Sequence, residues 1–303
     1  MNNFDIYLQI FAAQAGAKKV FAVEASNLAK LSREVIKENQ FENVIEVFEC
    51  KIEDFQLPAG IEKVDIIISE WIGFYLLHEG MLDSVIFARD NFLKSGGLLF
   101  PDKAIIYLSP CSVPQRFDQW ENLSGVRMTT FAEHLRLQKS MKPEILIIKP
   151  EDLLADDIAV AFFDLNDLEL SDLDEINFRE VVIARKEGKF QGLCIWFECM
   201  FPCKDEDDAV ILSTHPKAES THWKQTIILL PENIETLEPL TPVAFKLLIK
   251  RSEENSRRYN LLLEILNPED EEHPLPCDCV MTKCILTKAH LAAAMNPDAF
   301  ETA

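Results

Sequence analysis

Residues 61–100 read IEKVDIIISEWIGFYLLHEGMLDSVIFARDNFLKSGGLLF, and this stretch predicts a strand, a helix and a second strand. We expect the strands over Ile61–Ser69 and Leu98–Phe100, and the helix over His78–Phe92, where apolar side chains recur at helical spacing. A continuous β-branched run such as VDIII is typical of a strand covered on both faces, as in a parallel sheet with helices on either side.

The residues before this stretch repeat the same alternation. Gly16 is expected to end the first helix as a left-handed cap, and Ser26 is a good N-cap for the second. The expected elements are a helix over 5–15, a strand over 19–23, a helix over 27–39 and a strand over 44–48. This alternation predicts an α/β fold with a doubly wound domain over residues 1–101.

The pattern changes after Pro101. Strand-like segments joined by turn residues predict an antiparallel β lobe over 102–303, and they cover 104–108, 181–184, 193–201, 226–230 and 244–250. Residues 111–144 are mixed helical and apolar. They are either an arm that docks on a partner subunit or a helical connector packed on its own lobe.

The charge of the chain indicates a basic partner. Thirty Lys and Arg stand against 51 Asp and Glu, a net charge of −21, which argues against sequence-tolerant binding to nucleic acid. Residues 151–175 hold ten acidic residues and no Lys or Arg, and such a field attracts Arg-rich and Lys-rich segments. The sequence lacks a long apolar run and a secretory signal, so we expect no membrane partner and a soluble protein of the cytoplasm, the nucleus or both.

The eight cysteines follow no familiar zinc spacing. Cys194 and Cys199 lie in a strand-like apolar run and are expected to be buried thiols in a reducing compartment. Cys277 and Cys279 are expected to be ordinary reduced side chains. From spacing alone, the sequence therefore predicts no metal ligand.

Acidic residues stand where the predicted strands end, which is the edge at which open α/β sheets bind ligands. They are Glu24, Glu53 and Glu70. Glu79 follows Glu70 by nine residues, the wrong interval for one helical face, so these two side chains converge only if the segment folds back, as Gly73 would permit. Two convergent carboxylates can share a proton or clamp a guanidinium, and the alternative is that both are solvated on the surface.

At these residues the sequence resembles the protein arginine N-methyltransferase family. The segment SEWIGFYLLHEGMLDSVIFARDNFL (69–93) resembles the double-glutamate loop and following helix of that family. The segments FAAQAGAKKVFAVEAS (11–26), KIEDFQLP (51–58) and THWKQT (221–226) resemble its first helix and second strand, its adenine-contacting turn and its Thr-His-Trp loop. The similarity keeps its order over residues 11–250.

The resemblance implies transfer of methyl groups from S-adenosylmethionine to an arginine guanidinium nitrogen, as in the members that make asymmetric dimethylarginine. It implies a Rossmann-like domain, a β-barrel-like lobe and an arm at 111–144 that forms a homodimer, or a heterodimer with a family member. Basic substrates rich in Arg or in Arg and Gly, such as histones, are also implied.

The same resemblance assigns roles to single residues. Glu70 and Glu79 would clamp the substrate guanidinium, with His222 and Trp223 lining the acceptor site. On the cofactor side, Glu24 would hold the ribose, and Ile52 and Glu53 would hold the adenine. Met81 would limit the pocket near the transferring methyl.

The sequence departs from the family slightly at Ile72, where Met is usual, and at Gly80, where Ser is common, and more seriously in one region. A strand and a glycine-rich loop normally precede the helix that ends FAAQAG, whereas this sequence has MNNFDIYLQI at residues 1–10 and no Gly before Gly16. We therefore expect an incomplete cofactor domain with exposed ladder edges and apolar surface. Two hypotheses follow: a methyltransferase from an N-terminally shortened gene model or isoform, or a non-catalytic binding or dimerisation partner. A hydrolase that uses the two glutamates as acid and base is a third, disfavoured by the four ordered motifs.

Overall fold

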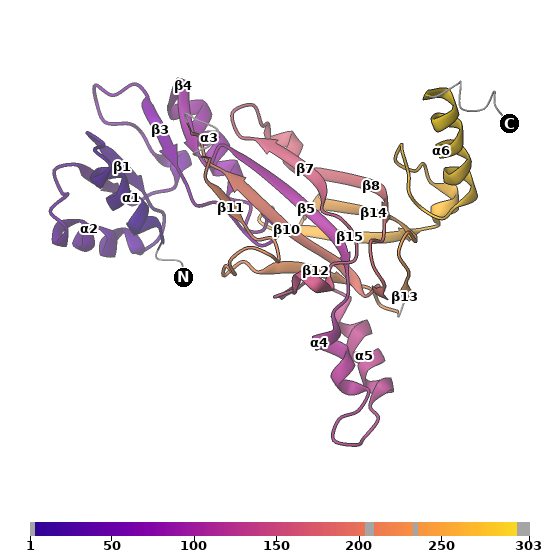
Figure 1. Cartoon of the computed structure of the whole chain (residues 1–303). Coiled ribbons are helices and arrows are strands. Elements are labelled where there is room, and N and C mark those ends of the chain that lie inside the picture. Colours follow the sequence, from indigo (N-terminus) through magenta and orange to yellow (C-terminus); the bar gives the residue numbers. More distant parts are fainter. Residues whose placement is uncertain (1–3, 204–208, 233–235, 296–303) are drawn as a thin grey trace.

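A computed structural model describes residues 4–203, 209–232 and 236–295 (Figure 1). The chain begins with helix α1 (Phe4–Gln14), strand β1 (Val20–Val23), helix α2 (Leu28–Glu38) and strand β2 (Ile45–Phe48). β1 and β2 pair in parallel. Gly16 follows α1 with φ +97°, the left-handed conformation expected of it. The predicted alternation of helices and strands is confirmed here.

The next unit is strand β3 (Val64–Ile68), helix α3 (Leu82–Phe92) and strand β4 (Leu93–Phe100), with β3 and β4 parallel. The helix begins four residues later than the sequence predicted. Glu79 and Gly80 have φ of +80° and +58°, outside the helical region, so the first turn of α3 cannot include them.

The expectation that β3 is covered on both faces is wrong. Ile66 and Ile68 on β3 are 48% and 43% exposed, and Leu98 on β4 is 45% exposed. Within the described residues, β3 pairs with β4 alone and β1 pairs with β2 alone, so these strands form two separate two-stranded sheets. The exposed ladder edges and apolar surface expected from the sequence are therefore present.

The β lobe contains two main antiparallel sheets. One runs in the order β6-β12-β10-β5-β7, with β11 also paired to β10, and the other in the order β15-β14-β8, while β13 pairs with β9. The bounds are β5 Lys103–Cys111, β6 Glu144–Leu146, β7 Ile158–Asp164, β8 Glu175–Ile183, β9 Gly188–Lys189, β10 Gly192–Met200, β11 Ile211–Ser213, β12 Gln225–Leu229, β13 Thr236–Leu237, β14 Pro242–Arg251 and β15 Tyr259–Leu266. The antiparallel β lobe predicted from the sequence is confirmed.

Strand β10 is buried on both faces because its side chains alternate between two cores. Leu193, Ile195 and Phe197 face the main core. Cys194 and Trp196 face a second core at the base of the helical segment. Cys194 and Cys199 are fully buried, as the sequence predicted, and burial raises the pKa of both thiols. The main core also contains side chains of the segment between β3 and α3, which fixes that segment to the β lobe.

The helical segment projects from the β lobe in Figure 1. It comprises α4 (Pro114–Phe117), the 3-10 helix η2 (Asp118–Trp120) and α5 (Thr129–Lys139). Phe117 anchors it in the second core, and the Arg136 guanidinium lies 4.3 Å from the centre of the Phe117 ring. Phe117 therefore packs the base of this segment on the lobe.

The chain ends beyond β15 with η6 (Pro268–Asp270) and helix α6 (Thr282–Met295). In Figure 1, α6 lies at the end of the β lobe away from β1 and β2. Three more 3-10 helices complete the described elements: η1 (Ile52–Asp54), η3 (Pro150–Asp152) and η4 (Leu170–Leu173). None of the helices in the described ranges is long and apolar enough to cross a bilayer.

Candidate active site

The segment 69–80, here called the double-glutamate loop, folds back on itself between β3 and α3. Gly73 and Leu76 exchange backbone hydrogen bonds of 2.9 and 3.0 Å. A Cβ atom on Gly73 would lie 1.7 Å from the carbonyl oxygen of His78, so the two backbone segments are in direct contact. The fold-back that the nine-residue spacing of Glu70 and Glu79 required is therefore present, and glycine is required at its closest approach.

The loop has an unusual backbone. Tyr75, Leu76 and Glu79 have φ of +43°, +73° and +80°. Non-glycine residues seldom adopt this conformation, and the surrounding structure must maintain it. Trp71, Leu76 and Leu77 supply that support, because all three are buried in the main core.

A partly buried hydrogen bond links two side chains of the loop. The Tyr75 hydroxyl lies 3.0 Å from Nδ1 of His78. Burial raises the pKa of Tyr75 to about 12, and burial also lowers the pKa of His78. Both side chains are therefore uncharged at neutral pH and connect the two arms of the loop without a buried charge.

Glu70 is half-buried at the start of the loop. Its Oε1 accepts a hydrogen bond of 3.0 Å from the backbone N–H of Ile72. Burial, and then the negative charges of Glu70 and Glu198, raise the pKa of Cys199 on β10. Glu70 thus presents its carboxylate where the end of β3 meets the β lobe.

Glu79 is exposed at the other end of the loop, and the turn between β14 and β15 holds its backbone. Its N–H donates to the carbonyl of Arg257 at 2.8 Å, and Nε of Arg257 donates to the carbonyl of Glu79 at 2.9 Å. A Cβ on the neighbouring Gly80 would lie 2.9 Å from Cα of Arg257. Arg257 is a residue that the sequence did not indicate, because it is 178 positions from Glu79.

The Thr-His-Trp loop packs against the double-glutamate loop. Nε1 of Trp223 donates a 2.9 Å hydrogen bond to the carbonyl of Ile72, and the Trp223 ring packs edge-on against Phe197. The imidazole of His222 lies with its centre 3.9 Å from that of Trp223. Two sequence motifs therefore adjoin although they are about 150 residues apart in the sequence. One is the loop with Glu70 and Glu79, and the other is the loop with His222 and Trp223.

A second group of predicted residues lies at the ends of β1 and β2. The N–H of Glu24 donates to the carbonyl of Phe48 at 3.0 Å, so the carboxyl ends of these parallel strands are adjacent. Oε1 of Glu24 accepts a 2.7 Å hydrogen bond from the N–H of Ser26. Ile52 and Glu53 follow β2 in η1.

Glu53 connects this edge to helix α3. Its Oε1 accepts a 2.7 Å hydrogen bond from Oγ of Ser84, and Met81 precedes the helix, half-buried against the main core. An edge-to-face contact between Phe48 and Phe55 continues the link through apolar side chains. Ser84 carried no recognisable signal in the sequence, because a single serine in a helix is usually surface.

These residues fit the adenosine half of a nucleoside cofactor. In open α/β sheets, a carboxylate at a strand end accepts hydrogen bonds from ribose hydroxyls, as Glu24 is placed to do. The backbone at Ile52 and Glu53 lies at the next strand end along the same edge.

The sequence and the structure both resemble those of known proteins. The profile of the arginine methyltransferase oligomerization subdomain matches residues 102–266. Protein arginine N-methyltransferase 6 of Danio rerio is 37% identical over 275 residues, which are 88% of this chain and 76% of that protein. Protein arginine N-methyltransferase 1 of Saccharomyces cerevisiae is 35% identical over 259 residues, covering 84% of this chain and 72% of that protein.

The solved structure of the Trypanosoma brucei PRMT1 enzyme-prozyme heterotetrameric complex with AdoHcy matches with a TM-score of 0.73 and 30% identity. The match covers 89% of this chain and 84% of that one. A structure of Arabidopsis thaliana protein arginine methyltransferase 10 matches with a TM-score of 0.71 and 28% identity, covering 86% of each chain. With the two adjoining loops, these similarities establish that the chain belongs to the protein arginine N-methyltransferase family.

Proposed function

We propose that this protein transfers a methyl group from S-adenosylmethionine to a guanidinium nitrogen of arginine in protein substrates. The observation that carries the proposal is the fold-back of the double-glutamate loop, with the Thr-His-Trp loop docked on it through Trp223. In this arrangement the segment that carries the two acidic residues lies beside the segment that carries His222 and Trp223. This arrangement suits the binding of a flat cation better than hydrolysis with the two glutamates as acid and base.

Glu70 and Glu79 are the proposed clamp. Arginine remains charged because its pKa is above about 12, so the protein has to orient a nitrogen rather than remove a proton with a strong base. Carboxylates match the planar donors of a guanidinium and stabilise its positive charge. His222 and Trp223 would line the opposite side of the acceptor site.

The proposed cofactor residues are Glu24 for the ribose, Ile52 and Glu53 for the adenine, and Met81 near the methyl group. S-adenosylmethionine supplies an electrophilic methyl on a sulfonium, which is its own leaving group. The chain's residues would position the two reactants, which is a large contribution that a protein can make to such a transfer. Asymmetric dimethylarginine is the expected product.

Basic proteins are the proposed substrates. The net charge of −21 and the acidic stretch 151–175 favour Arg-rich or Arg-Gly-rich tails, such as those of histones. We do not expect direct contact with nucleic acid. Such substrates agree with a location in the cytoplasm, the nucleus or both.

The chain carries an oligomerization subdomain, and we propose that the helical segment 111–144 is the arm of a dimer. Apolar side chains on this segment are exposed, with Val126 57%, Leu137 55% and Met141 85% exposed. A projecting apolar surface of this kind is typical of an interaction site. The partner is a second copy of the chain or another family member.

The proposal is tested by titrating the purified protein with S-adenosylmethionine in a calorimeter and by assaying methylation of an Arg-Gly peptide. We expect Glu79→Gln to abolish turnover while cofactor affinity stays close to that of the wild type. Glu62→Gln, at an exposed position, is the matched control and keeps turnover.

Methylation of an equally charged Lys-Gly peptide, or unchanged turnover in Glu79→Gln, contradicts the assigned clamp. If the protein neither binds the cofactor nor turns over substrate but assembles with an active relative, it is a non-catalytic partner instead.

A further inference from the structure

Four potential metal ligands converge in the C-terminal segment. The ligand atoms of His273, Cys277, Cys279 and Cys284 all lie within 4.8 Å of one another. The three cysteines are 5%, 3% and 6% exposed, so they are shielded from solvent. None of these residues belongs to the candidate active site.

The distances within the cluster match a tetrahedral ion. Nδ1 of His273 lies 3.5 Å from Sγ of Cys277, 3.4 Å from Sγ of Cys279 and 3.2 Å from Sγ of Cys284. In a tetrahedral zinc site, with Zn–S of about 2.3 Å and Zn–N of about 2.0 Å, nitrogen and sulfur ligands are about 3.5 Å apart. The ring nitrogen therefore faces all three sulfurs at nearly the separation that one central zinc ion imposes.

The outer nitrogen of the imidazole is already oriented. Nε2 of His273 lies 2.8 Å from the carbonyl oxygen of Pro268, which accepts its proton. This hydrogen bond selects the tautomer in which Nδ1 carries the free lone pair, and a ligating histidine commonly has such a second partner. The imidazole is thus prepared to coordinate through the nitrogen that faces the thiols.

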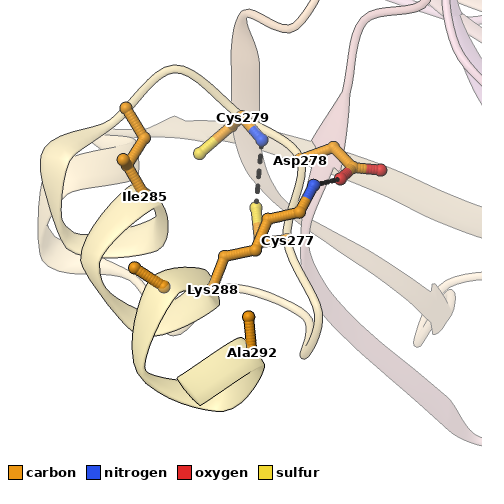
Figure 2. Close-up of a pocket in the computed structure, with 7 residues that line it drawn as sticks. Cys277, Asp278, Cys279, Ile285, Lys288 and Ala292 are labelled. Atoms are coloured by element: carbon orange, nitrogen blue, oxygen red, sulfur yellow. Dashed lines mark hydrogen bonds and ion pairs between the residues drawn. The ribbon is translucent and has the colours of Figure 1, made fainter. Parts of the chain in front are cut away.

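The surrounding backbone also supports the cluster. The N–H of Cys279 points to Sγ of Cys277 at 3.5 Å, as drawn in Figure 2. Nζ of Lys283 donates to the carbonyls of Pro268, Glu269 and Glu271 at 3.0, 2.8 and 2.8 Å. These bonds fix the loop that carries His273 to the first turn of α6, which carries Cys284.

Simple apolar packing explains the cluster less well. The three cysteines do belong to one buried cluster with Val181, Ile183 and Ala244 of the β lobe, as buried thiols often do. Packing alone, however, does not explain why one imidazole nitrogen lies close to all three sulfur atoms. A thiol is a weak hydrogen-bond donor, whereas a thiolate and an imidazole are strong zinc ligands.

We propose that His273, Cys277, Cys279 and Cys284 bind one Zn²⁺ ion as a structural site. Three thiolates and one imidazole complete a tetrahedral shell with no position left for substrate, which is the arrangement of structural zinc. The three thiols release their protons to solvent when the metal binds.

The proposed site departs from the expectation, made from cysteine spacing alone, that the sequence holds no metal ligand. In the pattern His-x3-Cys-x-Cys-x4-Cys, one residue separates the first two cysteines, whereas familiar zinc sites have two to four residues within a cysteine pair, and the cluster forms because a loop and a helix turn meet.

The ion would attach the C-terminal helix to the β lobe. Cys277 and Cys279 lie in the loop that packs against β8 and β14, and Cys284 is in α6. Figure 2 shows the first two side chains beside α6, where Lys288 pairs with Asp278 at 2.6 Å. Because the site is remote from the double-glutamate loop in the fold, its expected effect is on the stability of this end of the lobe.

The test is elemental analysis of the purified full chain by mass spectrometry, without added metal, after dialysis against a weak chelator. We expect about one zinc per chain in the wild type and in Cys203→Ser, whose thiol is exposed and outside the cluster. Cys284→Ser is expected to lose the bound zinc, and His273→Cys, which completes a four-cysteine set, is expected to retain it.

Cobalt substitution gives a second measurement that does not depend on the variants folding. The wild-type chain, loaded with Co²⁺ in place of zinc, is expected to show the intense visible absorption of a tetrahedral thiolate site. Absence of stoichiometric zinc together with absence of this spectrum in folded wild-type protein overturns the proposal. Zinc content that stays equal in Cys284→Ser and Cys203→Ser overturns the assigned ligands.

Discussion

Replacing Gly73 with alanine should open the double-glutamate loop. The new Cβ would lie 1.7 Å from the His78 carbonyl oxygen, whereas real Cβ atoms essentially never approach closer than 3.0 Å. The backbone segments must therefore separate by about 1.3 Å or more. Gly73 does not have a left-handed φ, so alanine is allowed there by the local backbone and the effect is steric.

The size of the effect follows from this displacement. Overpacking a buried site costs about 1 to 3 kcal/mol, and we expect the upper end because the obstacle is backbone that cannot change rotamer. A displacement of about 1 Å in a catalytic group lowers turnover by about 100-fold. Urea unfolding measures the first quantity, and kcat/KM on an Arg-Gly peptide measures the second.

Gly60→Ala is the matched control. A Cβ there has no neighbour within 4 Å, but φ is +87°, so the substitution strains the backbone without moving the loop. We expect a loss of about 1 kcal/mol and unchanged kcat/KM. If Gly73→Ala is no less stable than this control and keeps wild-type turnover, the contact with His78 does not hold the two glutamates, and the reasoning is refuted.

Three further predictions concern the supports of the site. Trp223→Phe removes the hydrogen bond to the double-glutamate loop and should lower the free energy of unfolding by about 1 kcal/mol. Trp120→Phe is the control and should lose less stability, because Nε1 of Trp120 has no hydrogen-bond partner in the described residues. Equal losses of unfolding free energy in urea for the two variants contradict the role of the Trp223 hydrogen bond. Arg251→Met breaks a two-bond ion pair of 2.6 and 2.8 Å with α3 and should cost about 1 to 3 kcal/mol, against less than about 1 kcal/mol for Lys250→Met, which loses an exposed pair. Burial raises the pKa of Tyr75 to about 12, so its contribution to stability is complete below about pH 10 and is lost as the pH rises towards 12, by about 2 to 3 kcal/mol. Between pH 9 and about 12, the free energy of unfolding should fall less steeply with pH for Tyr75→Phe than for the wild type. An equal pH dependence of this free energy in the two proteins excludes the assignment to Tyr75.

Much of the fold was predictable because its signals are local. Hydrophobic periodicity and cap residues such as Gly16 are properties of a few neighbouring residues, and they gave the order of helices and strands up to β4 and several strands of the β lobe, whereas β7, β15 and α6 were not predicted. The error at β3 has a different origin. The residues VDIII favour a strand whether or not other elements cover it. The exposure of that strand depends on which other strands and helices pack beside it.

The candidate site divides in the same way. From their spacing, Glu70 and Glu79 could converge only if the segment between them folded back, and the structure has this fold-back at Gly73. The residues that hold it in place, Arg257 and the indole of Trp223, come from far along the chain, and no local pattern indicates a partner at such a separation.

The sequence by itself determined many of the elements, the family motifs and the negative charge, because each depends on residue type and short spacing. Tertiary structure alone decided which side chains meet. The clearest case is the cluster at His273: its ligand intervals match no familiar pattern, and the four atoms converge only because the loop after β15 packs against the first turn of α6. Convergence in space is set by packing, and packing is a property of the whole chain.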